Sequence, residues 1–175
     1  LGFADLSSGP LVMIIPPQGV QGGISDAWQI TIPGSETPGT YLVVAPGQKE
    51  PDDVSGYIVC HSPTFNIFLG ARLTDEDPAS AKQTLAQLKM YPYAQRDNPP
   101  PIEIFDVGTR TWSGAPPRGM EYWQRLDDVM QREPIEPRDV FFHAMLRPLG
   151  LEKGRPFEPD ARQTKILTEA ALVGE

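Results

Sequence analysis

Cysteine and histidine are scarce in this sequence, and their scarcity argues against several kinds of site. Cys60 is the only cysteine among 175 residues, so no internal disulfide can form. The two histidines, His61 and His143, are too few for a zinc site, which needs three or four ligands, usually His and Cys at set spacings. Side chains of neighbouring strand residues point to opposite faces, so Cys60 and His61 make a poor nucleophile–base pair. We therefore predict no metal, no cofactor and no catalytic residue, with Cys60 in the core, His61 at a strand end and His143 on a helix, packed or at the surface.

Long apolar runs and clustered positive charge are also missing. No stretch approaches the ~20 apolar residues that cross a bilayer, which argues against membrane insertion. The 15 Lys and Arg are outnumbered by 23 Asp and Glu, for a net charge of −8. The densest basic group, Arg110, Arg118 and Arg125, is loose and interrupted by acids. Binding to phosphate backbones needs clustered positive charge, so we predict no nucleic-acid partner.

Proline, by contrast, is abundant, with 20 residues against the roughly 5% expected on average. Because proline interrupts helices and sheet ladders, the chain must consist of short elements joined by rigid turns. In the first half, apolar and alternating runs predict strands at residues 11–15, 26–32, 40–45, 56–61 and 66–73. Short strands joined by turns favour an antiparallel sandwich or roll over a parallel βαβ sheet. We interpret Gly19, Gly22 and Gly23 as a flexible turn that matches no phosphate-binding loop.

The second half changes to helical spacing. Asp77 and Pro78 predict a helix start, and further helices are expected at about 119–132, from Pro137 to Pro148, and from Pro159 to Gly174. A stiff proline connector at 98–101 and a short strand at 102–105 come before the last three. The chain is thus predicted to be α+β. Residues 1–110 form a β-sandwich, and residues 111–175 form a helical extension that packs on it as part of one structural unit.

The most site-like stretch runs from Asp106 to Gly114 and combines an acid, a base, an aromatic and two glycines. Loops of this kind often carry function. Arg110 could hold a carboxylate in a bidentate fork, and Trp112 could stack on a sugar or aromatic ligand. The alternative is that Asp106 pairs with Arg110 while Trp112 plugs the sandwich edge. We keep Asp106, Arg110, Trp112 and His61 as candidate ligand-binding residues; their convergence in one pocket would favour a ligand or enzyme site.

Four spaced motifs resemble one bacterial family. They are Asp5–Pro10, Gly39–Gly47, Ser62–Arg72 and Gly150–Asp160, and in this order they are similar to the family called domain of unknown function 1254. The resemblance implies a jelly-roll β-sandwich with helical decorations. It also implies a second domain, of unknown function 1214, in the same polypeptide, and export to the periplasm or beyond. The chain begins at Leu1 without a methionine, so we expect a fragment that lacks a leader and its partner domain. The family brings no established catalytic residues.

Two functions from different classes stay open at this point. The first is a non-catalytic structural, interaction or ligand-binding module, which the missing nucleophile and metal sets favour. The second is a hydrolase-like enzyme whose active site is completed by the partner domain. Because the resemblance implies a second domain, we also predict a large exposed apolar patch where that domain docks. Homo-oligomers could form through the same patch.

Overall fold

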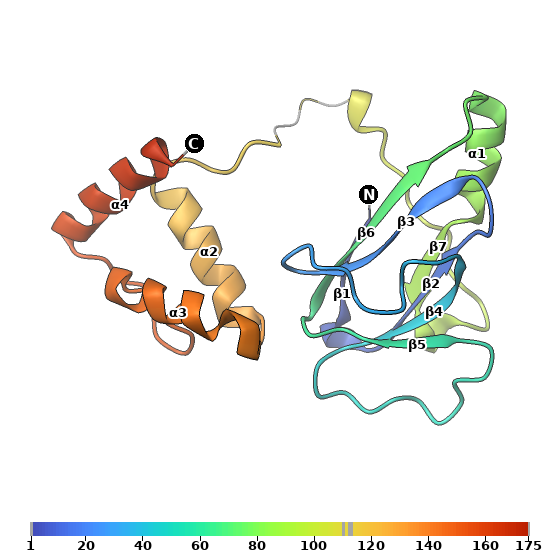
Figure 1. The fold of residues 1–175 in the computed structure, drawn as a ribbon, viewed down its shortest axis with the longest axis horizontal. Helices are drawn as coiled ribbons and strands as arrows, with labels where there is room; N and C mark the ends of the chain where they lie inside the picture. The colour runs from blue at the N-terminus through green and yellow to red at the C-terminus, as the bar shows by residue number, and fades with distance from the viewer. Residues whose placement is uncertain (1, 110, 112–113, 175) are drawn as a thin grey trace. The chain divides into compact units, whose positions relative to one another are not determined.

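The computed structural model describes residues 2–109, 111 and 114–174, and the chain divides into two compact units, Leu1–Ile104 and Phe105–Glu175. The first unit holds all the strands of the described residues together with α1 (Pro78–Gln87), and the second is helical (Figure 1). The predicted α+β class is therefore confirmed. Among the described residues, no helix is both long and apolar enough to span a membrane.

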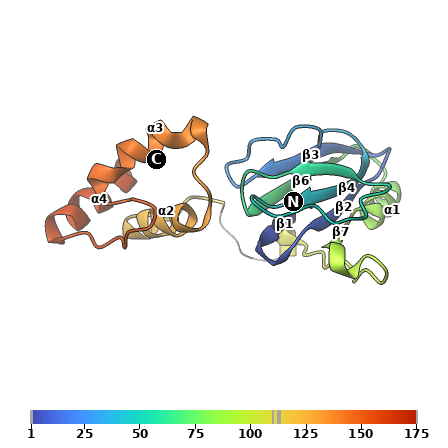
Figure 2. The same ribbon diagram turned by 90° about the horizontal axis from the view of Figure 1, so that it is seen from below.

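The first sheet has three antiparallel strands. β1 (Gly2–Asp5) and β3 (Val20–Asp26) flank β6 (Asn66–Leu73), in the order β1-β6-β3. Of these, only β6 was predicted with its observed bounds. β1 is an additional strand that the sequence reasoning missed, and it leads directly into the short 3-10 helix η1 (Leu6–Ser8). Figure 2 shows β3 and β6 of this sheet lying side by side.

The second sheet has four strands in the order β5-β4-β2-β7, with bounds Ile58–His61, Gly39–Val44, Leu11–Ile15 and Lys89–Pro92. Its pairs are antiparallel except β4 with β5, which are parallel. The prediction of a wholly antiparallel sandwich is therefore wrong at this edge. A parallel pair needs a connection of about a dozen residues or more, and the segment between β4 and β5 supplies one.

Both faces of this second sheet are covered. One face shares a core cluster with the first sheet, so the two sheets pack face to face through Leu11, Met13, Tyr41, Val43, Ile24, Ile67 and Leu69. The other face buries Val12, Leu42 and Val44 against Tyr91 and Tyr93, and Val54 and Tyr57 of the β4–β5 connection pack on them. A strand that is buried on both faces has a continuous apolar run in its sequence. This is why β2 and β4 were predicted correctly.

The predicted strand at 26–32 is wrong. β3 ends at Asp26, and the Asp26 carboxylate oxygen Oδ1 accepts hydrogen bonds from the backbone N–H groups of Trp28 and Ile30, both at 2.9 Å. Gln29 has a φ of +62° in the turn that follows. A short polar side chain that bonds nearby backbone competes with a sheet ladder. After this turn the chain folds back along β3, through an isolated bridge between Thr31 and Ser25 and a 2.8 Å hydrogen bond from the Ile32 N–H to the Ile24 carbonyl oxygen.

The prediction of a glycine turn is wrong for Gly22 and Gly23, whereas Gly19, with a φ of +74°, does lie in the bend before β3. Gly22 and Gly23 lie inside β3, opposite Ala71 and Gly70 of β6. The strand expected at 102–105 does not form; that segment has no regular structure. The first predicted helix is confirmed as α1, capped by the Asp77 side chain, which accepts from the backbone N–H of Ser80 at 2.9 Å. It ends at Gln87, because β7 begins at Lys89.

The helical unit contains α2 (Met120–Arg132), α3 (Val140–Leu146) and α4 (Ala161–Val173), with 3-10 turns at Val107–Thr109, Pro137–Asp139 and Arg147–Leu149. All three predicted helices are present. Among the described residues of this unit, the buried apolar side chains are Met130, Leu151 and Leu167. α2 and α4 are tied by the indole Nε1–H of Trp123, which donates to the Leu167 carbonyl oxygen at 2.7 Å. Asp160 and Gln163 form a reciprocal capping box at the start of α4.

Candidate functional site

The four residues predicted to bind a ligand are distributed over both units. His61 ends β5, and its Nε2 lies 2.8 Å from Oε1 of Glu50, with both side chains largely exposed. Asp106 is exposed, and its Oδ1 accepts from the backbone N–H of Gly108 at 2.9 Å. Arg110 and Trp112 lie outside the described residues. The convergence of this set in one pocket therefore stays a prediction.

The remaining candidates of the sequence belong to the core or to packing. Cys60 is buried, as predicted, and burial raises the pKa of its thiol, which keeps it protonated and unreactive. His143 of α3 is half-buried. Its Nδ1 has no hydrogen-bond partner among the described residues, and burial lowers its pKa, which favours the neutral ring. Within the described ranges, no three His, Cys, Asp or Glu side chains gather as a metal site would require.

The helical unit has a pocket of about 630 Å³ that the sequence reasoning did not find. Its lining comes from the end of α4, the start of α2 and the segment before α2. Its lining consists of Ala115, Pro116, Pro117, Arg118, Tyr122, Trp123, Ala170, Ala171 and Gly174. The volume falls within the roughly 300–1,000 Å³ of small-molecule sites.

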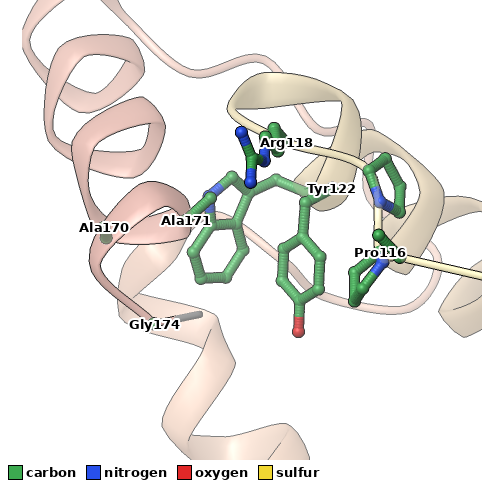
Figure 3. Close-up of a pocket in the computed structure, with 9 residues that line it drawn as sticks. Pro116, Arg118, Tyr122, Ala170, Ala171 and Gly174 are labelled. Atoms are coloured by element: carbon green, nitrogen blue, oxygen red, sulfur yellow. The ribbon is translucent and has the colours of Figure 1, made fainter.

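Local sequence explains how this pocket is built. Pro116 and Pro117 keep the approaching chain extended, and Gly119, at a φ of +61°, turns it into α2. Tyr122 and Trp123 then follow in the first turn of α2, with ring centroids 5.2 Å apart and planes at 89°. Figure 3 shows the Tyr122 ring standing between Pro116 and the end of α4.

Small residues keep the pocket open on the α4 side. Ala170, Ala171 and Gly174 line it on this side with at most one methyl group each. Arg118 is the one charged residue among the lining residues. The signal in the sequence was the pair of adjacent aromatics just after Pro-Pro-Arg-Gly, but the alanines opposite them are almost 50 positions further on.

A second surface feature lies on α3. Val140, Phe141, Phe142 and Met145, which we call the α3 apolar surface, are 55%, 68%, 62% and 59% exposed. The two phenylalanine rings meet edge to face with centroids 5.9 Å apart. The helix predicted from Pro137 is present as α3. Its large apolar side chains are mostly exposed to solvent. Exposed apolar patches mark interaction sites in many proteins.

Comparisons with known proteins identify the family. Residues 1–92, more than half of the chain, match the family described as protein of unknown function (DUF1254). The chain belongs to the DUF1254 family. The match ends at Pro92, the last residue of β7, so it covers both sheets of the first unit. The resemblance seen in the sequence is thus confirmed, whereas pairing with a domain of unknown function 1214 stays a prediction. No curated protein matches the chain.

A solved structure extends the likeness beyond the DUF1254 match. The VPA0106 protein from Vibrio parahaemolyticus, a structural genomics target, superposes with a TM-score of 0.65 at 14% identity. The alignment covers 99% of this chain but 46% of that one, so this DUF1254 chain spans less than half the length of its structural relative. At this identity the likeness concerns the fold alone. It includes the helical unit, which the family match does not reach.

Proposed function

We propose that this chain is a non-catalytic interaction module whose α3 apolar surface binds a second domain of the same polypeptide. The observation that carries the proposal is the exposure of Phe141 and Phe142, each more than 60% exposed. Removing one phenylalanine side chain from water contributes about 1.5–3 kcal/mol. Two such rings with Val140 and Met145 beside them are sufficient for the centre of an interface.

The length of the solved relative argues for a second domain as the occupant. More than half of the VPA0106 chain lies beyond the part that this chain matches. A unit with few buried apolar residues of its own gains stability when its exposed helix is covered by such a domain. We further propose that the two facing sheets have jelly-roll connectivity and that the protein is periplasmic or secreted, as the DUF1254 resemblance suggests.

The test uses the native gene from which this chain comes. The domain beyond the chain is expressed separately and titrated onto this chain by isothermal calorimetry. We expect the F141S/F142S double variant to bind that domain at least about tenfold more weakly than the wild-type chain, because two anchor rings lose their contact.

Phe3→Ser provides the control, because Phe3 is 76% exposed in the other unit and should leave the affinity unchanged. Equal affinities of wild type and F141S/F142S would overturn the proposal. A gene that encodes no further domain would also overturn it. A dimer of this chain that dissociates in F141S/F142S would assign the surface to a second copy instead.

A further inference from the structure

We propose that the pocket between residues 115–118, α2 and α4 binds a small organic anion with an aromatic or alkyl body. This site is separate from the α3 apolar surface, with which it shares no residue. Nothing in the DUF1254 match concerns it, because the match ends at residue 92.

The lining residues determine which apolar group the ligand carries. Two prolines, two aromatic rings and three alanines face a volume of about 630 Å³, which suits a ligand of one or two fused rings. Trp123 uses its only polar atom, Nε1–H, on the Leu167 carbonyl, so its ring offers the pocket apolar surface. The Tyr122 ring is 38% exposed and stands in the pocket (Figure 3). Flat ligands stack on such rings, a contact worth more than the burial of area alone.

Arg118 sets the charge of the ligand. It is the charged member of the lining, and a guanidinium matches the two oxygens of a carboxylate in a bidentate fork. Arg118 also has an interaction within the chain. A guanidinium carries five N–H donors, so it can keep that interaction and still bind a carboxylate.

The distribution of charge also admits an anion here. Ten of the 15 basic residues but 12 of the 23 acidic ones lie in residues 105–175, which leaves a net charge of −2 there and −6 in residues 1–104. The acidic character of the chain thus resides mainly in the first unit. The roles that the sequence suggested for Arg110 and Trp112, a carboxylate fork and a stacking ring, are available in this pocket from Arg118 and Tyr122.

The probe is 2-naphthoate, compared with 2-naphthalenemethanol, which has the same rings without the charge. Binding is followed by calorimetry and by the ¹H–¹⁵N signal of the Trp123 indole. We expect saturable binding of naphthoate with a shift of that signal. Arg118→Gln should weaken naphthoate about tenfold and leave naphthalenemethanol unchanged, because the charged contact alone is lost.

Ala171→Leu should fill the pocket and abolish binding of both probes, while Ala161→Leu, at the far end of α4, should change neither. Tyr122→Ala is a second variant that keeps the test decisive if Ala171→Leu misfolds; it should weaken both probes equally. The proposal is overturned if naphthoate does not bind, if Arg118→Gln binds it like the wild type, or if the probes lose affinity in F141S/F142S instead, which would place them on α3.

Discussion

A Gly22→Ala substitution should strongly destabilise the strand-rich unit. A Cβ at Gly22 would lie 1.9 Å from the carbonyl oxygen of Gly70 and 2.8 Å from the Cα of Ala71. Both are backbone atoms of β6, the central strand of the first sheet, so no change of side-chain rotamer can relieve the clash. β3 and β6 must separate, which also opens the core cluster at Ile24 and Leu69. We expect a loss of about 3 kcal/mol in the free energy of unfolding.

The measurement is urea unfolding followed by ¹⁹F NMR of the chain labelled with fluorotryptophan. Trp28 reports on the first unit and Trp123 on the second, so the two transitions are read separately. Gly23→Ala is the matched control on the same strand, because its Cβ would meet the Ser35 carbonyl oxygen at 3.1 Å, which a small shift can relieve. A Trp28 transition at the wild-type urea concentration in Gly22→Ala would contradict the β3–β6 register.

The elements that were predicted correctly carry their signal within a few neighbouring residues. β2, β4 and β6 are apolar runs closed by turn residues, and α1 begins at a capping Asp followed by Pro. Such signals depend on local propensity and burial alone. α4 was predicted from Pro159 to Gly174 and spans Ala161–Val173, with Asp160 as its capping residue.

The wrong predictions fall where the local structure depends on a distant residue or on a side-chain hydrogen bond. Residues 26–32 alternate like a strand, yet the Asp26 carboxylate bonds two backbone N–H groups that a ladder would need. Gly22 was interpreted as a turn residue. In the structure it pairs with β6, about fifty residues later in the chain, whose backbone lies too close for a side chain. The parallel β4–β5 pair likewise depends on a connection that packs on the sheet rather than on either strand.

The pocket was beyond prediction for a related reason. Its two sides come from residues 115–123 and 170–174, and the packing of α2 on α4 brings them together. The sequence predicted a base beside an aromatic ring at Arg110 and Trp112, which lie outside the described residues. Within the described residues, that combination occurs a few positions later, where a helix start fixes the rings.

A Lys153→Met substitution should destabilise the helical unit by about 2–3 kcal/mol. The Lys153 ammonium donates to the carbonyl oxygens of Met130, Gln131 and Glu133, at 3.2, 2.7 and 2.7 Å. These carbonyls form the end of α2 and its first following residue. Pro134 has no N–H to offer the Met130 carbonyl, so the chain itself cannot complete the helical bond there. Methionine keeps the length and apolar part of the side chain but leaves the three carbonyls without their charged donor.

The same labelled protein measures this effect through the Trp123 transition. Lys165→Met, an exposed lysine of α4, is the matched control and should change the free energy of unfolding by less than about 0.5 kcal/mol. If Lys153→Met unfolds like Lys165→Met, the ammonium does not hold the end of α2. A shift of the Trp28 transition together with that of Trp123 would show that the two units unfold as one. An unchanged Trp28 transition would show that the helical unit depends on this lysine by itself, as its few buried apolar residues lead us to expect.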